Sequence, residues 1–171
     1  DVECQGVVGT VMTNLGVEYA FQELGIPFFR ASVGDRNVIE LMKEKNCKFG
    51  GESSGHIVCS DLNTTGDGII SSLQVVAAIV KSGVTLSSLV SSIKKVPQHM
   101  VNVRVSKSFD FEHKTIKQAI LESEKKLKSK GRLLVRPSGT EPVIRIMAES
   151  PDETMVVTEI NKLSEIIKNH N

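Results

Sequence analysis

Short apolar runs alternate with helical repeats through the first half of this chain. Residues 6–11, 27–31 and 57–59 have the length and composition of buried strands, and a segment with apolar residues at helical spacing follows each of them. Alternation of this kind is typical of an α/β layer domain, in which helices pack on a sheet. We therefore predict an α/β domain with a mixed sheet over residues 1–93.

The helices of this domain have recognisable ends. Asn14, Asp35 and Asp67 are expected N-caps, because their side chains can accept hydrogen bonds from the first unpaired backbone N–H groups of a helix. Gly25 and Gly83 are expected to end the first and the third helix. The side chains expected to point inward are Leu15, Phe21 and Leu24 in the first helix, Val38, Leu41 and Met42 in the second, and Ile69, Leu73, Val76, Ala77 and Val80 in the third.

The second half has a different pattern. Residues 100–105 alternate with period two, as a half-buried strand does, and the apolar runs 133–135 and 143–147 flank a polar loop. Residues 150–153 have the S-x-x-E form of a helix capping box. We predict a small α+β domain over residues 100–171, an antiparallel sheet with helices on one face. The expected inward helical residues are Ile116, Ala119, Ile120 and Leu127, then Val156, Ile160, Leu163 and Ile167.

A linker is expected between the two domains at residues 94–99, which contain Pro97. The composition also changes there. Residues 94–171 hold 15 basic and 10 acidic side chains, although the whole chain has a net charge of only +1. No concentrated basic stripe with interleaved aromatic residues is present, so we expect no nucleic-acid partner.

Membrane and metal roles find no support in the sequence. The longest apolar run, residues 75–80, is far too short to span a bilayer. The three cysteines, Cys4, Cys47 and Cys59, lack metal-ligand spacing. We predict reduced thiols in a cytoplasmic protein, with no metal site in this chain.

The loop RPSGTEP at residues 136–142 has the chemistry of an anion site. Arg136 offers a planar set of donors that suits a phosphate, and Ser138 and Thr140 add hydroxyl donors. Gly139 allows backbone N–H groups to turn toward the same oxygen atoms. The same spacing would also fit a common Gly/Pro hairpin with an exposed arginine, so both interpretations stay open.

A second polar loop, GGESSGH at residues 50–56, gathers a carboxylate, two hydroxyls and an imidazole. The carboxylate of Glu52 can accept hydrogen bonds from two neighbouring sugar hydroxyls, with Ser54 and His56 nearby. The alternative is that these are surface polar residues in a flexible turn. The residues alone therefore predict a two-domain protein that binds a phosphorylated polyol, and they predict no reaction.

The two loops in this order resemble the α-D-phosphohexomutase superfamily, most closely the bacterial phosphoglucosamine mutase family. TGDG at residues 65–68, VMTNLG at 11–16 and VGDR at 33–36 are similar to that family as well. The resemblance covers nearly the whole chain and implies the third and fourth of four domains, with the first residues of the third expected to be missing and a TATA-binding-protein-like α+β fold for the last. The implied site residues are Glu52, Ser54 and His56 for the sugar, Arg136, Ser138, Gly139 and Thr140 for the phosphate, and Arg145 and Glu141 in support.

The resemblance also implies a reaction. Members of the family convert glucosamine 6-phosphate to glucosamine 1-phosphate through a bisphosphorylated intermediate, using a phosphoserine and Mg²⁺ held by aspartates of another domain. Neither the serine loop nor a D-x-D-x-D cluster occurs in these 171 residues. We therefore expect no catalytic residue here except His56 as an auxiliary candidate, and an inactive fragment whose partners are a phosphorylated amino sugar and the remaining mutase domains. A related phosphomannomutase or phosphoglucomutase, or a non-catalytic phosphosugar-binding module, remains an alternative.

Overall fold

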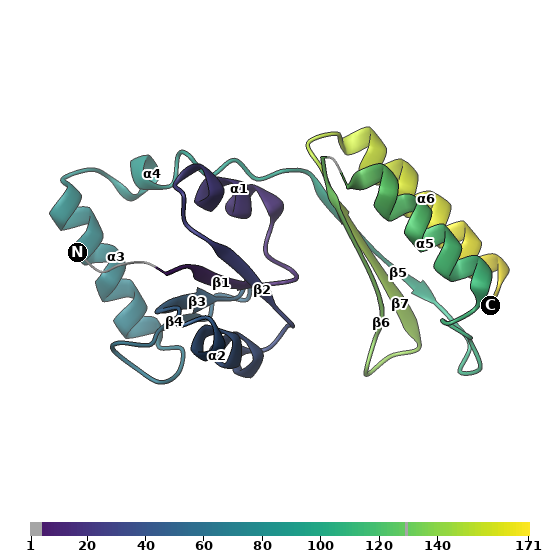
Figure 1. Ribbon diagram of the computed structural model, residues 1–171, viewed down its shortest axis with the longest axis horizontal. Helices are drawn as coiled ribbons and strands as arrows, with labels where there is room; N and C mark the ends of the chain where they lie inside the picture. Colours follow the sequence, from purple (N-terminus) through teal and green to yellow (C-terminus); the bar gives the residue numbers. More distant parts are fainter. Residues whose placement is uncertain (1–4, 129) are drawn as a thin grey trace. The chain divides into compact units, whose positions relative to one another are not determined.

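The structure is a computed structural model that describes residues 5–128 and 130–171 (Figure 1). The chain forms two compact units that divide between Lys95 and Val96. Each unit has its own sheet and its own helices. No helix in the described part of the chain is both long and apolar enough to cross a membrane.

The N-terminal unit contains a four-stranded mixed sheet with the order β2-β1-β3-β4. β1 (Val7–Thr10) pairs in parallel with β2 (Phe28–Ala31) and with β3 (Phe49–Gly51). β4 (Ile57–Cys59) pairs antiparallel with β3. The prediction of a mixed sheet is confirmed, and the tight β3–β4 connection holds the polar loop at residues 52–56.

Four helices accompany this sheet: α1 (Leu15–Glu23), α2 (Asp35–Glu44), α3 (Gly68–Ser82) and the short α4 (Leu86–Leu89). The Asn14 side chain accepts a hydrogen bond from the backbone N–H of Gly16, and Asp67 accepts from Ile69 and Ile70, so both predicted N-caps are confirmed. The prediction for Asp35 is wrong. Gly34 is the N-cap of α2, and Asp35 is the first helical residue. Its carboxylate interacts favourably with the positive, N-terminal end of the helix dipole.

Helix α2 covers one face of the sheet and forms the core of this unit. Val8, Val58, Val38 and Met42 are buried there together. Gly50 allows the close approach, because a Cβ atom at that residue would lie 2.5 Å from the Met42 sulfur. The predicted inward face of α2 is therefore correct, and this face lies close to the sheet.

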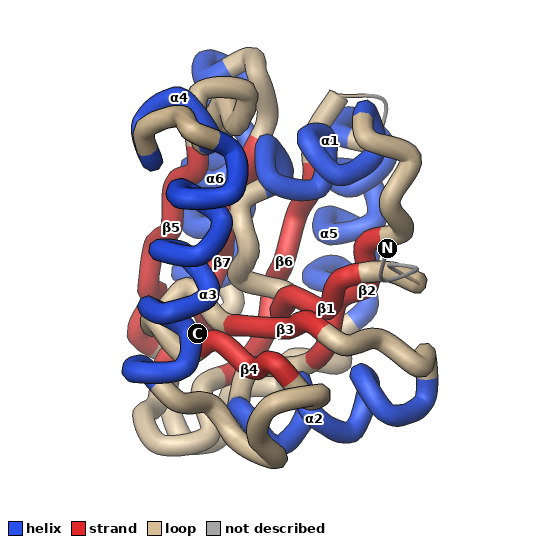
Figure 2. The backbone as a smooth tube through the Cα atoms, turned by 90° about the vertical axis from the view of Figure 1, so that its left-hand side faces the viewer, coloured by secondary structure: helices blue, strands red, loops and turns tan. Residues whose placement is uncertain are grey.

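The opposite face is covered only at its edges, by α1 beside β2 and by α3 beside β4 (Figure 2). The predicted inward face of α3 is wrong, because Ile69 and Val80 are 74% and 76% exposed and Leu73 and Val76 are also exposed. Leu24, expected inward in α1, is 70% exposed. In the described part of the chain α3 packs mainly against β4 and α4, and the apolar side chains named above remain exposed to solvent.

The C-terminal unit has an antiparallel sheet with the order β5-β7-β6, formed by Gln98–Arg104, Val143–Glu149 and Arg132–Pro137. Helices α5 (Lys114–Leu127) and α6 (Glu153–Asn169) lie side by side on one face of it (Figure 1). Ile116, Ile144, Ile146, Ile160 and Leu163 are buried between sheet and helices. The predicted α+β arrangement is confirmed.

The predicted capping box at the start of α6 is not formed. Asp152 is the N-cap and accepts from the backbone N–H of Met155, while the Ser150 hydroxyl accepts from the N–H of Asp152. Glu153, expected to reach back to Ser150, pairs with His99 of β5 at 2.9 Å instead. Asp152 is two residues closer than Ser150 to the free N–H groups of the first helical turn, and it therefore takes the capping role.

Two buried carboxylates accept hydrogen bonds that connect neighbouring elements of the C-terminal unit. Glu149 is fully buried and accepts from Arg132 across the β6–β7 pair at 2.8 Å. Glu159 of α6 accepts from Ser123 at 2.7 Å and from Lys126 at 2.8 Å, both on α5. Burial raises the pKa of Glu159, but these two hydrogen bonds and the Lys126 charge outweigh it, and the pKa lies below its usual value.

Candidate functional site

The β3–β4 connection brings the three predicted sugar-binding side chains together. Ser54 Oγ lies 3.1 Å from Glu52 Oε2 and 3.0 Å from His56 Nδ1. The turn is closed by the backbone N–H of Glu52, which donates to the carbonyl of His56, and Gly55 has the positive φ of 98° that the turn requires. The result is a connected chain of carboxylate, hydroxyl and imidazole at the end of the sheet.

The start of α2 contributes two residues that the sequence analysis did not assign to this loop, its N-cap Gly34 and its first residue Asp35. The backbone N–H of Gly34 donates to Glu52 Oε1 at 2.6 Å, and Asp35 Oδ1 lies 3.6 Å from His56 Nδ1. The VGDR segment at residues 33–36 was the available signal, since it carries part of the family resemblance. The hydrogen bond from Gly34 fixes one oxygen of Glu52, and Ser54 contacts the other. The start of α2 and the β3–β4 connection therefore both orient the Glu52 carboxylate.

Asp35, Glu52 and His56 also bring ligand atoms within 4.8 Å of one another. Sequence spacing alone could not reveal this grouping, because Asp35 lies on a different element. The group suits Mg²⁺ poorly. Mg²⁺ prefers oxygen ligands in octahedral geometry, whereas one of the three ligands is an imidazole and one Glu52 oxygen already accepts from Gly34.

The second predicted loop connects β6 to β7 in the C-terminal unit. Strand register places Arg136 directly opposite Arg145, and Asn102 of β5 opposite Arg145 on the other side. Ile144 and Ile146 face the helices, so the alternation of β7 puts Arg145 on the face of the sheet that the helices leave uncovered. The two guanidinium groups therefore share one row on that face.

Charge compensation in this row is incomplete. Glu141 Oε2 lies 3.5 Å from Arg145 Nη2, and Arg145 Nε is buried with no hydrogen-bond partner among the described residues. In the same part of the chain no carboxylate pairs with Arg136. Like charges directly opposite each other on neighbouring strands repel. An anion bound at the row would relieve that repulsion.

The loop itself is ordered by its own backbone. Ser138 N–H donates to the carbonyl of Val143 at 2.9 Å, and Val143 N–H donates to the carbonyl of Glu141 at 2.8 Å. Gly139 has no positive φ, and a Cβ atom there would meet nothing within 4 Å. The expected need for a glycine backbone conformation is therefore absent, and Gly139 is exposed.

Comparisons with known proteins identify the family. Residues 2–96 match the family model described as phosphoglucomutase/phosphomannomutase, alpha/beta/alpha domain III, and residues 100–162 match the C-terminal domain of the same family. The chain belongs to the phosphoglucomutase/phosphomannomutase family. The resemblance inferred from the two loops is thereby confirmed.

Curated relatives of this family give a consistent name. The chain is 56% identical over 164 residues to a phosphoglucosamine mutase of Hahella chejuensis, and 49% identical over 166 residues to one of Cellvibrio japonicus. These matches cover 95% and 96% of the chain but only 37% of each relative. The chain therefore spans little more than a third of the length of these relatives.

Solved structures agree on the fold. Aspergillus fumigatus N-acetylphosphoglucosamine mutase superposes with a TM-score of 0.79 over 96% of this chain and 38% of that one, at 21% identity. The same fungal protein in complex with GlcNAc-6P and magnesium superposes with a TM-score of 0.74 over 94% of this chain and 40% of that one, at 20% identity. At such identities the similarity concerns the fold alone.

Proposed function

We propose that this chain supplies the sugar and phosphate recognition of a phosphoglucosamine mutase, an isomerase that interconverts glucosamine 6-phosphate and glucosamine 1-phosphate. The curated relatives that match 95% or more of the chain carry that name. The structural observation that carries the proposal is the arginine row of Arg136 and Arg145, whose charge Glu141 compensates only in part, beside the ordered loop at residues 138–142.

The arginine row has the properties of an anchor for a phosphate that is not transferred. Arg136 and Arg145 supply charge on one face, while Ser138, Gly139 and Thr140 supply hydroxyl and backbone N–H donors beside it. A phosphate has enough oxygen atoms to accept from both groups at once. In a mutase reaction the sugar must reverse its orientation, so a fixed site for the distal phosphate keeps the substrate bound in either orientation.

The loop at residues 52–56 provides the complementary sugar contact. One oxygen of Glu52 is held by Gly34, which leaves the carboxylate in place to accept from a sugar hydroxyl through the other oxygen. Ser54 is exposed and can exchange its contact with Glu52 for a contact with the sugar. We assign His56 an auxiliary role beside the ring, oriented by Asp35.

The transferred phosphoryl group and the metal have no site in our assignment for this chain. Mg²⁺ would neutralise the charge that develops on the phosphoryl group. The Asp35–Glu52–His56 group fits Mg²⁺ poorly, so we place the ion, and the phosphoserine, on other domains of the longer mutase. A cytoplasmic location remains a prediction.

Titration calorimetry tests this proposal on the chain as it stands. Glucosamine 1-phosphate, mannose 1-phosphate and inorganic phosphate are titrated into the wild-type chain, Arg136→Ala and Glu52→Gln. We expect Arg136→Ala to weaken all three ligands about tenfold or more, because a charge-assisted hydrogen bond to phosphate is removed. Glu52→Gln should weaken the sugar phosphates and leave inorganic phosphate unchanged.

Lys125→Ala serves as the control for loss of a positive charge, since Lys125 is exposed on α5 away from the loop. Phosphate binding that is equally strong in wild type and Arg136→Ala would contradict the anchor. Preference for the mannose phosphate over the amino-sugar phosphate would move the assignment to a phosphomannomutase of the same family.

A further inference from the structure

A cavity of about 360 Å³ lies against the loop at residues 138–142, and neither arginine of the row is among its lining residues. Pro137 and Ile144, which line it, are paired across β6 and β7 and face the helix side of the sheet, whereas Arg136 and Arg145 face the other side. The second wall of the cavity is the segment at residues 105–111. The cavity therefore shares Ser138, Gly139 and Thr140 with the proposed phosphate anchor, whereas neither Arg136 nor Arg145 lines it.

Both walls of the cavity are held by backbone hydrogen bonds. Val105 N–H donates to the carbonyl of Pro142 at 2.9 Å, which ties the segment to the loop. Phe109 N–H donates to the carbonyl of Ser106 at 3.2 Å, and Ser138 N–H donates to Val143. A ligand would thus meet a site whose walls are already in place, and little ordering cost would oppose binding.

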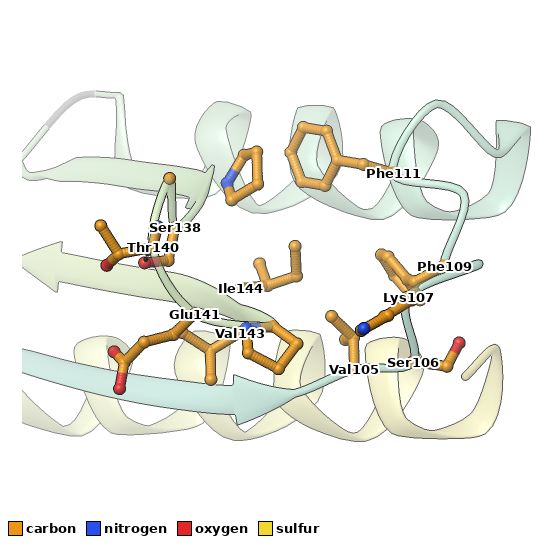
Figure 3. Close-up of a pocket in the computed structure, with 13 residues that line it drawn as sticks. Val105, Ser106, Lys107, Phe109, Phe111, Ser138, Thr140, Glu141, Val143 and Ile144 are labelled. Atoms are coloured by element: carbon orange, nitrogen blue, oxygen red, sulfur yellow. Dashed lines mark hydrogen bonds between the residues drawn. The ribbon is translucent and has the colours of Figure 1, made fainter.

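The lining of the cavity combines apolar side chains with a cation. Phe109, Phe111 and Ile144 supply apolar lining, and Lys107 reaches the cavity from the segment at residues 105–111 with its ammonium nitrogen beside Val105 (Figure 3). The apolar side chains offer room for a ring or a short alkyl group. A cation next to such a surface favours an amphipathic ligand with a negative group.

Lys107 has no carboxylate partner among residues 5–128 and 130–171. Glu141 is the single carboxylate among the lining residues, and its nearest cation is Arg145 at 3.5 Å. Figure 3 shows the Glu141 carboxylate directed away from Lys107. The positive charge of Lys107 is thus available to a ligand in the cavity.

We propose that this cavity binds a small amphipathic anion, with a ring-sized apolar group on Phe109, Phe111 and Ile144 and a phosphate or carboxylate at Lys107. The site is additional to the proposed mutase function and uses none of the arginine row. Because residues 138–141 form one wall of the cavity, an occupant would also restrain the loop that carries the phosphate anchor.

The test is an amide NMR titration of the chain with phenyl phosphate, benzoate and inorganic phosphate. We expect phenyl phosphate to shift the amides of residues 105–111 and 144, with a Kd of about 1 mM for a ligand of this size. Benzoate shifting the same amides would show that a carboxylate also fits. Phenyl phosphate alone doing so would restrict the class to phosphate monoesters.

Three variants separate this site from the proposed anchor. Lys107→Met keeps most of the apolar stem, and we expect it to weaken phenyl phosphate at residues 105–111 about tenfold. Lys125→Met and Arg136→Ala should leave that binding unchanged, while Arg136→Ala removes the response to inorganic phosphate. Shifts confined to residues around Arg136, or shifts at 105–111 that persist in Lys107→Met, would overturn the proposal without affecting the mutase assignment.

Discussion

The two units of the chain differ in how much of the apolar surface of their helices is buried. In the C-terminal unit, α5 and α6 enclose a single core with the sheet, and Ile146 and Ile167 have no exposed surface. In the N-terminal unit, α2 covers one face well, while the apolar side of α3 remains in solvent. The same helical periodicity thus gives a closed core in one unit and an open face in the other, which shows that an amphipathic pattern predicts a helix but not its partner.

The largest expected effect comes from removing buried volume in the closed unit. Ile146→Ala should lower the free energy of unfolding of the C-terminal unit by about 3–4 kcal/mol, because it leaves a cavity in a fully buried part of the sheet. Val76→Ala, a truncation of an exposed apolar side chain on α3, should alter the free energy of unfolding by less than about 0.5 kcal/mol. Urea unfolding of both variants gives the comparison, and similar losses in the two would show that α3 is covered in solution.

The polar contact between α5 and α6 gives the next effect. Glu159→Gln should cost about 1–2 kcal/mol near neutral pH, because it removes a charged hydrogen bond from Lys126 and weakens the one from Ser123. The wild-type contribution also depends on pH. Since the folded pKa of Glu159 lies below its unfolded value of about 4.3, the stabilisation is complete above that value and is lost as the pH falls through the folded pKa.

Unfolding measured as a function of pH checks this assignment. The wild type should lose stability below about pH 4.3 more steeply than Glu159→Gln, because the variant has no carboxylate to protonate there. Glu124→Gln is a suitable control, since Glu124 is exposed on the same helix α5 that holds Lys126. Identical acid dependence in wild type and Glu159→Gln would argue against the depressed pKa.

Helix caps should affect both units alike, because a cap is a local interaction. Asp67→Ala at the start of α3 and Asp152→Ala at the start of α6 should each cost about 1 kcal/mol, since each removes an acceptor for free backbone N–H groups. Thermal unfolding of the two variants measures both losses. A much smaller loss for Asp67→Ala would indicate that α3, with its exposed face, is already frayed in the wild type.

The smallest effect on stability should accompany a clear effect on self-association. Leu73→Lys combined with Val80→Lys replaces two exposed apolar side chains on α3, so the unfolding free energy should change little. Large exposed apolar patches promote association, and the variant should remain monomeric at concentrations where the wild type associates. Sedimentation velocity measures this directly. A wild type that is already monomeric at high concentration would rule out α3 as a self-association surface.

Much of the fold was predictable from local patterns. The strand runs, the N-caps at Asn14 and Asp67 and the glycine stop at Gly83 all follow from interactions within a few residues, and the structure confirms them. The Asp35 and Ser150 caps were predicted wrongly, because neighbouring residues could begin the helix equally well and the choice depended on where the chain leaves its strand.

Some residues of the candidate site were also predictable from local sequence, and others were not. The sequence identified Glu52, Ser54 and His56 as a group because they share one loop, and Arg136 because of its flanking residues. The contribution of Gly34 and Asp35 could not be found from spacing, since they lie 18 and 17 residues before Glu52 and contact Glu52 and His56 only once the unit has folded. The pairing of Arg136 with Arg145 likewise depends on strand register.

The sequence by itself determined the two-unit organisation, the secondary structure and the chemical character of both polar loops, because each depends on residue type and short-range spacing. Only the tertiary structure decided that α3 exposes its apolar side, that Arg136 and Arg145 share a row, and that Lys107 stands beside an apolar cavity behind the same loop. The physical reason is that burial and charge compensation depend on which residues contact a side chain. Strand register and helix packing decide those contacts, and they bring together residues that are far apart in the sequence.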